Sequence, residues 1–469
     1  MDTKALRQKI LDLAIHGKLV PQDPNDEPAS VLLERIRAEK ERLIKEGKIK
    51  KGKKSAKTSD KPHYPFELPK GWEWTTIEDV CSKIGSGSTP KGSNYSKEGI
   101  PFFRSQNVYN SGLIMSDIKY ISDDIHQKMI GTEVVANDLL LNITGGSLGR
   151  CAVIPSNFEK GNVSQHVCIL RPIVIKPEFL HCFILSSFFA KSMKITGSGR
   201  EGLPKYNLEK MLLPLPPEQE QERIVAETKR LQSFVDELET SCENMTKLVA
   251  QVKSKVLDLA IHGKLVPQDS NDEPASELLK RINPKAEIIS DNGHYQKLPE
   301  GWCLTILGSI GTWQSGATPS RLQKDYYGGN IPWLKTGDLN DGIITNIPEF
   351  ITEKALEETS VKLNPTDSIL IAMYGATIGK IGILSFPATT NQACCACLDY
   401  KIDKMYIFYF LLSNRINFVS MGGGGAQPNI SKEKIVNTTF PLPPLAEQKR
   451  IVSKIEELFH QLNMIEESL

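Results

Sequence analysis

The sequence predicts an α/β (α+β) protein: two tandem domains of like fold, separated by long antiparallel coiled-coil helices in a circularly permuted, pseudo-twofold arrangement. Three observations lead to this prediction: a nearly identical internal repeat, a looser series of matched landmarks, and a seven-residue apolar period outside the domains. The length of 469 residues agrees with it, because an average domain has ~150 residues.

Composition excludes several classes of protein. Apolar residues make up 40% and charged residues 24% of the chain, as in soluble proteins with a buried core. A net charge of +1 excludes a uniformly basic protein that wraps nucleic acid and leaves room for a local basic patch. No apolar run reaches the ~18 residues of a membrane span, and the first residues lack a signal core. We therefore expect a cytoplasmic protein, and the nine scattered cysteines do not suit a secreted disulfide scaffold.

The chain repeats itself. Lys9–Ile36 and Lys255–Ile282 are identical except at the first-copy positions 10, 24, 31 and 34. A looser repeat of Gly, Pro and Trp landmarks lies between the copies, while the residues around those landmarks differ. This pattern indicates two domains of one fold with different surfaces. The matched landmarks are Leu68–Trp72 with Leu298–Trp302, Ser86–Pro90 with Ser315–Pro319, Asp138 with Asp367 before an apolar strand and a glycine turn, and Pro214–Pro217 with Pro441–Pro444.

Helical periodicity follows each Pro-Leu-Pro-Pro segment. Glu218–Ile261 contains no Pro or Gly, so it predicts one helix of roughly 65 Å. We expect it to run antiparallel to a second helix made from the two chain ends; the alternative is packing on its neighbouring domain. The expected seam consists of Ile224, Leu231, Leu238, Met245, Val252 and Leu259, with Ile451, Leu458 and Ile465 in the C-terminal segment.

These patterns divide the chain into five parts. They are an N-terminal helical repeat with a basic linker (1–66), a first domain (67–217), the central helix with the second repeat (218–297), a second domain (298–444) and a C-terminal helix (445–469). Helix-rich segments are expected at 179–193 and 405–418. Residues 35–61 carry twelve Lys or Arg against four acids and lack a counterpart in the second half. This composition predicts either a solvated linker or an arm that contacts DNA phosphates.

The arrangement resembles the DNA specificity (S) subunit of type I restriction-modification systems. The resemblance rests on the tandem domains opened by LPxGW, the SGxTP loops, and PLPP segments followed by Gln221–Val225 and Gln448–Val452. It implies that each domain is a target recognition domain reading one half of a split site on double-stranded DNA. It also implies that the helices set the spacer and dock two DNA adenine methyltransferase (M) subunits, with restriction/translocase (R) subunits completing the complex and no membrane involved. S-adenosylmethionine would then belong to the methyltransferase, and this chain would carry no cofactor.

Candidate DNA contacts are polar or basic residues on the glycine-rich turns between strands, where side chains reach base edges. A structural role in the turn is the alternative for each of them. In the first domain they are Ser88, Thr89, Arg104, Ser105, Gln106, Asn107, Thr144, Ser147, Arg150, Arg200, Lys205 and Tyr206; in the second they are Thr318, Lys335, Thr336, Asp338, Tyr374, Thr377, Lys380, Gln427 and Asn429.

The sequence offers no catalytic motif. Both Pro-Pro segments lack the flanking polar and aromatic residues of an adenine methyltransferase loop, and they suit the first turn of a helix. Cys394, Cys395 and Cys397 read as buried strand residues rather than metal ligands, since neighbours on a strand face opposite sides. His16 and His262 read as helix-end residues. We therefore expect a non-catalytic, metal-free DNA-recognition subunit; the alternatives are the specificity part of a related restriction enzyme and a coiled-coil scaffold without DNA binding.

Overall fold

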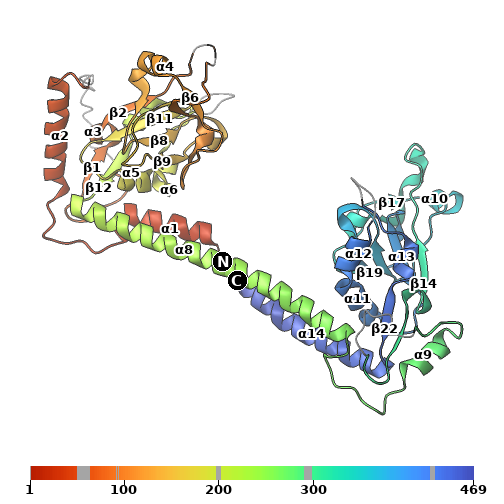
Figure 1. Ribbon diagram of the computed structural model, residues 1–469. Coiled ribbons are helices and arrows are strands. Elements are labelled where there is room, and N and C mark those ends of the chain that lie inside the picture. The colour runs from red at the N-terminus through yellow and green to blue at the C-terminus, as the bar shows by residue number, and fades with distance from the viewer. Residues whose placement is uncertain are drawn as a thin grey trace. The chain divides into compact units, whose positions relative to one another are not determined.

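The computed structural model describes residues 2–49, 64–90, 92, 94–196, 202–289, 298–422 and 428–469. Its contacts divide the chain into two compact units, Met1–Ser241 (unit 1) and Cys242–Leu469 (unit 2). The boundary falls inside one continuous helix, α8 (Glu218–Ile261), so each unit holds part of it (Figure 1). None of the described helices is long and apolar enough to cross a membrane.

Unit 1 is built around two four-stranded sheets. One is antiparallel with the order β2-β11-β8-β9, and the other has the order β6-β3-β10-β7 with β3 and β10 parallel. Two short pairs, β1-β12 and β4-β5, complete it. The strands are β1 (Glu73–Thr76), β2 (Cys81–Ser86), β3 (Ile100–Phe103), β4 (Val108–Tyr109), β5 (Gly112–Leu113), β6 (Lys119–Ile121), β7 (Glu133–Val134), β8 (Leu139–Asn142), β9 (Cys151–Val153), β10 (Gly161–Val163), β11 (Val167–Pro172) and β12 (Leu212–Leu215).

Strand β8 is buried on both faces, which explains its unbroken apolar sequence. Leu139 and Leu141 pack into a cluster with the helix residue Phe179, whereas Leu140 packs into a second cluster with Phe103. Helices cover unit 1: α1 (Thr3–Ile15), α2 (Ala29–Lys45), α3 (Ile77–Val80), α4 (Asp123–Lys128), α5 (Pro177–Ile184), α6 (Ser187–Ser192) and α7 (Lys205–Glu209).

Unit 2 repeats this plan with one sheet larger and the other smaller than in unit 1. A five-stranded sheet has the order β14-β21-β18-β19-β16, a three-stranded sheet has the order β17-β15-β20, and β13 pairs with β22. The strands are β13 (Cys303–Ile306), β14 (Thr312–Ser315), β15 (Tyr327–Leu334), β16 (Gly342–Ile344), β17 (Phe350–Ile351), β18 (Ile369–Ala372), β19 (Ile381–Leu384), β20 (Thr389–Thr390), β21 (Cys394–Leu398) and β22 (Thr439–Leu442). The helices are α9 (Ala275–Ile282), α10 (Glu353–Glu358), α11 (Lys404–Ser413), α12 (Arg415–Met421), α13 (Lys432–Val436) and α14 (Leu445–Ser468).

The expected α/β class and the helix-rich segments at 179–193 and 405–418 are confirmed by these elements. One matched landmark is corrected. The left-handed residue before β18 is Asp367 (φ 68°), and its counterpart before β8 is Asn137 (φ 67°), not Asp138. Asp138 is instead fully buried and accepts two hydrogen bonds from Arg171, at 2.7 and 2.8 Å. The sequence match missed this because Asn and Asp both tolerate the left-handed region.

In each unit α8 runs antiparallel to a helix from one chain end. In unit 1, Arg7 near the start of α1 bonds Asp236 at 2.6 Å and Glu239 at 2.8 Å, while Gln22, which follows α1, bonds Glu220 near the start of α8. In unit 2, Lys253 of α8 bonds Glu466 near the end of α14 at 2.6 Å. Lys253 holds the position in the second repeat that Arg7 holds in the first, so the same contact recurs.

The apolar seam differs in part from the expectation. Ile224 and Ile451 are fully buried, but Leu238, Met245, Val252 and Ile465 are exposed, and Leu231, Leu259 and Leu458 are half-buried. The most deeply buried side chains along α8 belong to a different series with seven-residue spacing, in which Thr228, Val235, Val249 and Val256 are buried. The reason is that a single partner helix covers only part of the apolar stripe.

The basic stretch is helical at its start. In α2, Arg35 pairs with Glu27 and Glu218, and Arg42 pairs with Glu39 and Glu46, so these cations have acidic partners. The rest of the stretch, from residue 50, lies outside the described residues. In unit 2 the counterpart of α2 is α9, which is only eight residues long.

Candidate nucleic-acid interface

The turn that follows β8 in unit 1 and β18 in unit 2 has the same architecture in both units. A short 3-10 turn, Gly145–Ser147 after β8 and Gly375–Thr377 after β18, begins with a left-handed glycine. The late loop lies against it each time: Thr144 bridges to Gly202, and Tyr374 bridges to Asn429. The structure thus brings the predicted turn residues and the late loops together in each unit, which the sequence could not show. Arg200 and Gln427 lie outside the described residues.

The side chains on these two turns differ. In unit 1 the guanidinium of Arg150 lies 4.7 Å above the ring of Tyr109, and the hydroxyl of Thr144 lies 2.8 Å from Nδ1 of His166. Ser147 is half-buried in the same turn. In unit 2 the ring of Tyr374 is exposed, and the hydroxyl of Thr377 donates to the Tyr374 carbonyl at 2.8 Å. The last position of the turn therefore carries a half-buried cation in both units, Arg150 and Lys380, whereas Thr144 in unit 1 is replaced by the exposed ring of Tyr374 in unit 2.

The segment after β3 and its counterpart after β15 supply a second group of candidates. Asn107 accepts from the Arg104 amide at 3.1 Å and donates to the Ile114 carbonyl at 3.0 Å, and it is almost fully buried. Asp338 caps the matching turn in unit 2 by accepting from the Lys335 amide at 2.8 Å. These two side chains hold the turn, as an Asx residue does.

The neighbouring residues reach outward and meet an acid. Arg104 donates to Asp117 at 3.1 Å, and Gln106 donates to the same carboxylate at 2.7 Å. The hydrogen bond from Arg104 lowers the pKa of Asp117. In unit 2, Lys335 pairs with Glu349 at 2.7 Å. Ser105 and Thr336 lie in the same two turns. The acids keep these long side chains in one place before any ligand binds.

The SGxTP loops pass close to the sheet. A Cβ on Gly87 would lie 1.9 Å from the Val163 carbonyl oxygen, and one on Gly316 would lie 2.2 Å from the Thr390 carbonyl oxygen. Glycine is therefore required by close backbone approach. The hydroxyls beyond them, Thr89 and Thr318, are exposed and contact Gln165 and Gln392, and Ser88 is exposed as well.

Two expected candidates remain, and one residue that was not expected joins them. Lys205 and Tyr206 begin α7, where Lys205 pairs with Glu209 at 3.3 Å and Tyr206 is exposed. Sequence reasoning missed Arg321, whose guanidinium lies 4.3 Å from the ring centre of Tyr327 and 5.0 Å from that of Trp333. The available signal was an arginine just after the SGxTP loop with aromatic residues nearby.

Cysteine and histidine occupy structural positions. Cys394, Cys395 and Cys397 are fully buried in β21, and burial raises the pKa of Cys395 to about 12. In the described ranges, no three His, Cys, Asp or Glu side chains are grouped so as to hold a metal ion. Nδ1 of His16 lies 2.6 Å from the Asp12 carbonyl, and Nδ1 of His262 lies 2.7 Å from the Asp258 carbonyl. Both histidines thus bond the carbonyl one turn earlier in their own helix.

Each unit carries what we call a joint. In unit 1 it consists of Gln22, Trp72 and Glu220, where the loop after α1, the LPxGW segment and the start of α8 meet. The Trp72 indole donates to Glu220 at 2.9 Å, and Gln22 donates to its other oxygen at 3.1 Å. Burial raises the pKa of Glu220 although both hydrogen bonds act in the opposite direction.

The joint of unit 2 consists of Gln268, Trp302 and Glu447. Its hydrogen bonds measure 3.0 Å from Trp302 and 3.1 Å from Gln268, and burial raises the pKa of Glu447 in the same way. An ion pair adjoins each joint: Arg223 with Asp26 at 2.5 Å, and Arg450 with Asp272 at 2.6 Å. The repeat in the sequence is therefore a repeat of contacts.

The fold and these surfaces define a chain with two like-built recognition units. Comparison with known proteins gives the family. The model described as "Type I restriction modification DNA specificity domain" matches residues 69–245 and 299–469, so the chain belongs to this family and carries two copies of its domain.

Relatives match over nearly the full length. The type I restriction enzyme EcoAI specificity subunit of Escherichia coli is 32% identical over 98% of this chain and 90% of that protein. The EcoEI specificity subunit of the same species is 28% identical over 99% and 90%. Among solved structures, the HsdS subunit from Thermoanaerobacter tengcongensis gives a TM-score of 0.56 at 20% identity, covering 86% of this chain and 93% of that one, which supports the fold.

Proposed function

We propose that this protein is the DNA-specificity subunit of a type I restriction-modification complex, in which unit 1 and unit 2 each read one half of a bipartite target on double-stranded DNA. The observation that carries the proposal is the turn after the central strand. Its backbone is the same in both units, with left-handed Gly145 and Gly375 and a bridged late loop, while the side chains on it differ. A shared scaffold with different polar side chains is what two readers of different base sequences need.

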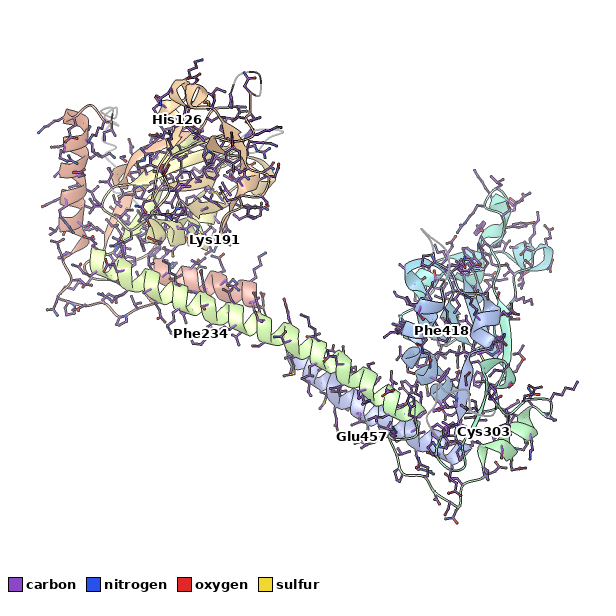
Figure 2. All side chains as sticks on the ribbon, viewed as in Figure 1. His126, Lys191, Phe234, Cys303, Phe418 and Glu457 are labelled. Atoms are coloured by element: carbon purple, nitrogen blue, oxygen red, sulfur yellow. The ribbon has the colours of Figure 1, made fainter. Side chains whose placement is uncertain are left out.

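The long helices would dock the partners and set the spacer. Unit 1 exposes Leu6 on α1 and Phe234 and Leu238 on α8, where Figure 2 labels Phe234. Unit 2 exposes Met245, Leu248, Val252, Met464 and Ile465 along α8 and α14. Leu6 and Val252 are equivalent in the repeat and are equally exposed, at 38%. Apolar surface repeated in this way suits two copies of one partner, which we propose are DNA adenine methyltransferase (M) subunits.

The chain itself would perform no chemistry. The methyl donor S-adenosylmethionine would bind to the methyltransferase subunits, and cleavage would belong to restriction/translocase (R) subunits. What supports this is the structural role of the residues that could otherwise act. Asn107 and Asp338 cap turns, His16 and His262 bond their own helices, and every cysteine except Cys242 is buried.

Adenine methylation mapping tests the proposal. The protein is co-expressed with the methyltransferase encoded beside it, in a host free of adenine methylation, and a culture without the protein serves as the control. We expect a new split motif of two defined halves around a fixed gap. Methylation that does not depend on this chain, while both proteins are soluble, would contradict the proposal and favour a scaffold.

The role of the helices has a test of its own. Removing seven residues from the middle of α8 keeps the heptad phase and shortens the helix by about 10 Å. We expect the gap in the motif to shrink by about three base pairs, since base pairs are 3.4 Å apart. Both half-sites should stay the same, and a changed half-site with an unchanged gap would contradict the spacer role.

A further inference from the structure

Among the described residues of unit 2, the most exposed large apolar side chain is Leu322, followed by Ile416 at 78%. Leu322 is 94% exposed, although it is a large apolar residue, and it lies just beyond the SGxTP loop. Water around a whole leucine side chain is unfavourable, and burial against another surface would remove that cost. A single exposed leucine is common on protein surfaces, so the surroundings of this one decide its significance.

Leu322 lies on a loop, Pro319–Tyr327, that is fixed on both sides. The Tyr327 hydroxyl donates to the Pro319 carbonyl at 2.6 Å, and the Gln323 amide donates to the Ser320 carbonyl at 3.1 Å, which makes a tight turn with Leu322 at its third position. Behind the turn, the Trp333 indole donates to the Ala317 carbonyl at 3.1 Å. The leucine is therefore held outward by an ordered backbone.

Arg321 anchors this loop from within. Its guanidinium lies above the rings of Tyr327 and Trp333 and donates through Nη1 to Glu349, so the side chain is held from two directions. Glu349 also pairs with Lys335, one of the candidate DNA contacts. Arg321 is thus a positioning residue, and it connects Leu322 to the candidate interface of unit 2.

We infer that Leu322 is an apolar wedge that enters the stacked bases of the half-site read by unit 2, an inference that rests on the proposed function. Rigid apolar side chains flanked by cations can separate a base step and kink the duplex. Lys324 follows the turn two residues after Leu322, and Lys335 shares Glu349 with Arg321. In unit 1 no described residue between Ser86 and Gly99 is a large exposed apolar one, so the wedge belongs to unit 2 alone.

The test uses the assembled complex and the motif found by methylation mapping. Leu322→Ala is compared with Leu322→Met, which keeps an apolar tip, and with Leu363→Ala, an exposed leucine elsewhere in unit 2 (48% exposed). Duplexes carry 2-aminopurine, whose fluorescence rises when it is unstacked, at each position of either half-site in turn. We expect the wild-type complex and Leu322→Met to raise the fluorescence at one step in the unit-2 half, in addition to the adenines that the methyltransferase subunits themselves unstack in both halves.

Leu322→Ala should abolish that rise and weaken DNA binding about tenfold. The unit-1 half-site and the assembly of the complex should be unchanged, and Leu363→Ala should behave like the wild type. A wild-type motif combined with unchanged binding and fluorescence in Leu322→Ala would overturn the wedge and leave the proposed function standing. Loss of assembly in Leu322→Ala would also overturn the wedge, because the leucine would then contact a protein. A wild-type complex without a split motif would overturn the proposed function itself.

Discussion

The two units of this protein resemble each other in one way at the joints and in another way at the turns that follow β8 and β18. In the joints, side chains and contacts are the same: Trp72 and Trp302 donate to Glu220 and Glu447 at 2.9 and 3.0 Å. In the turns after β8 and β18 the backbone is the same and the side chains differ, as Thr144 and Tyr374 illustrate. The comparison teaches that a duplicated protein can keep the contacts that attach a helix to its domain while changing the side chains that the domain presents.

The largest effect is expected from removing the joint tryptophans. Trp72→Ala and Trp302→Ala each delete a nearly buried indole and leave a buried carboxylate with one donor fewer. We expect each to cost about 3–5 kcal/mol in its own unit. Hydrogen exchange measured separately for the two units checks this, with Trp72→Phe and Trp302→Phe as milder variants. Losses that differ between the units by more than about 2 kcal/mol would show that the joints are not equivalent.

The loop glycines should come next. Gly87→Ala and Gly316→Ala place a methyl group against a carbonyl oxygen, so we expect about 2–4 kcal/mol of destabilisation. Each variant should also lose recognition of one half-site and keep the other. Gly131→Ala and Gly342→Ala are matched controls outside the candidate interface, because a Cβ meets nothing within 4 Å at Gly131 and only an ordinary contact, at 3.7 Å, at Gly342. If the controls were as damaging as the loop variants, steric approach would not be the reason for glycine.

A smaller effect, dependent on pH, follows from the joint glutamates. Burial raises the pKa of Glu220, so the folded protein holds this proton more tightly than the unfolded chain. The stability that the group contributes is therefore full below the unfolded-state pKa of about 4.3 and is lost as the pH rises through the raised value. Glu220→Gln should match the wild type at low pH and become relatively more stable as the pH rises.

Urea unfolding of unit 1, monitored by hydrogen exchange at a series of pH values from 4 upward, measures the difference in unfolding free energy between Glu220→Gln and the wild type. Glu447→Gln should show the same trend in unit 2, because burial raises that pKa too. Glu237→Gln, an exposed position on α8, is the control. A difference that shrank as the pH rose would mean that the carboxylate stabilises its joint in the charged form.

Much of this comparison could be predicted from the sequence. The repeat predicted two equivalent units, and the absence of Pro and Gly between residues 218 and 261 predicted α8. The line of the heptad buried deepest could not be predicted, because Leu238 and Val235 are equally apolar and only the partner helix distinguishes them. The contact of Arg321 with the ring of Trp333, twelve residues away, could not be predicted either, because the fold brings the two side chains together. The meeting of Tyr374 with Asn429 depends on tertiary structure in the same way.

The smallest effect tests whether acids restrain the reading residues. Asp117 holds Arg104 and Gln106, and it has a left-handed backbone (φ 62°) that asparagine also tolerates. Asp117→Asn keeps the turn and removes one negative charge from the candidate interface, so we expect DNA binding to tighten about twofold to threefold at low salt, and less at high salt. Fluorescence anisotropy at two salt concentrations measures it, with Asp124→Asn, at the exposed start of α4, as the control. Weaker binding that appears only at the unit-1 half-site would mean that Asp117 positions Arg104 for base contact instead of restraining it. In that case the binding free energy lost by ordering a freed guanidinium exceeds the free energy gained by removing the negative charge.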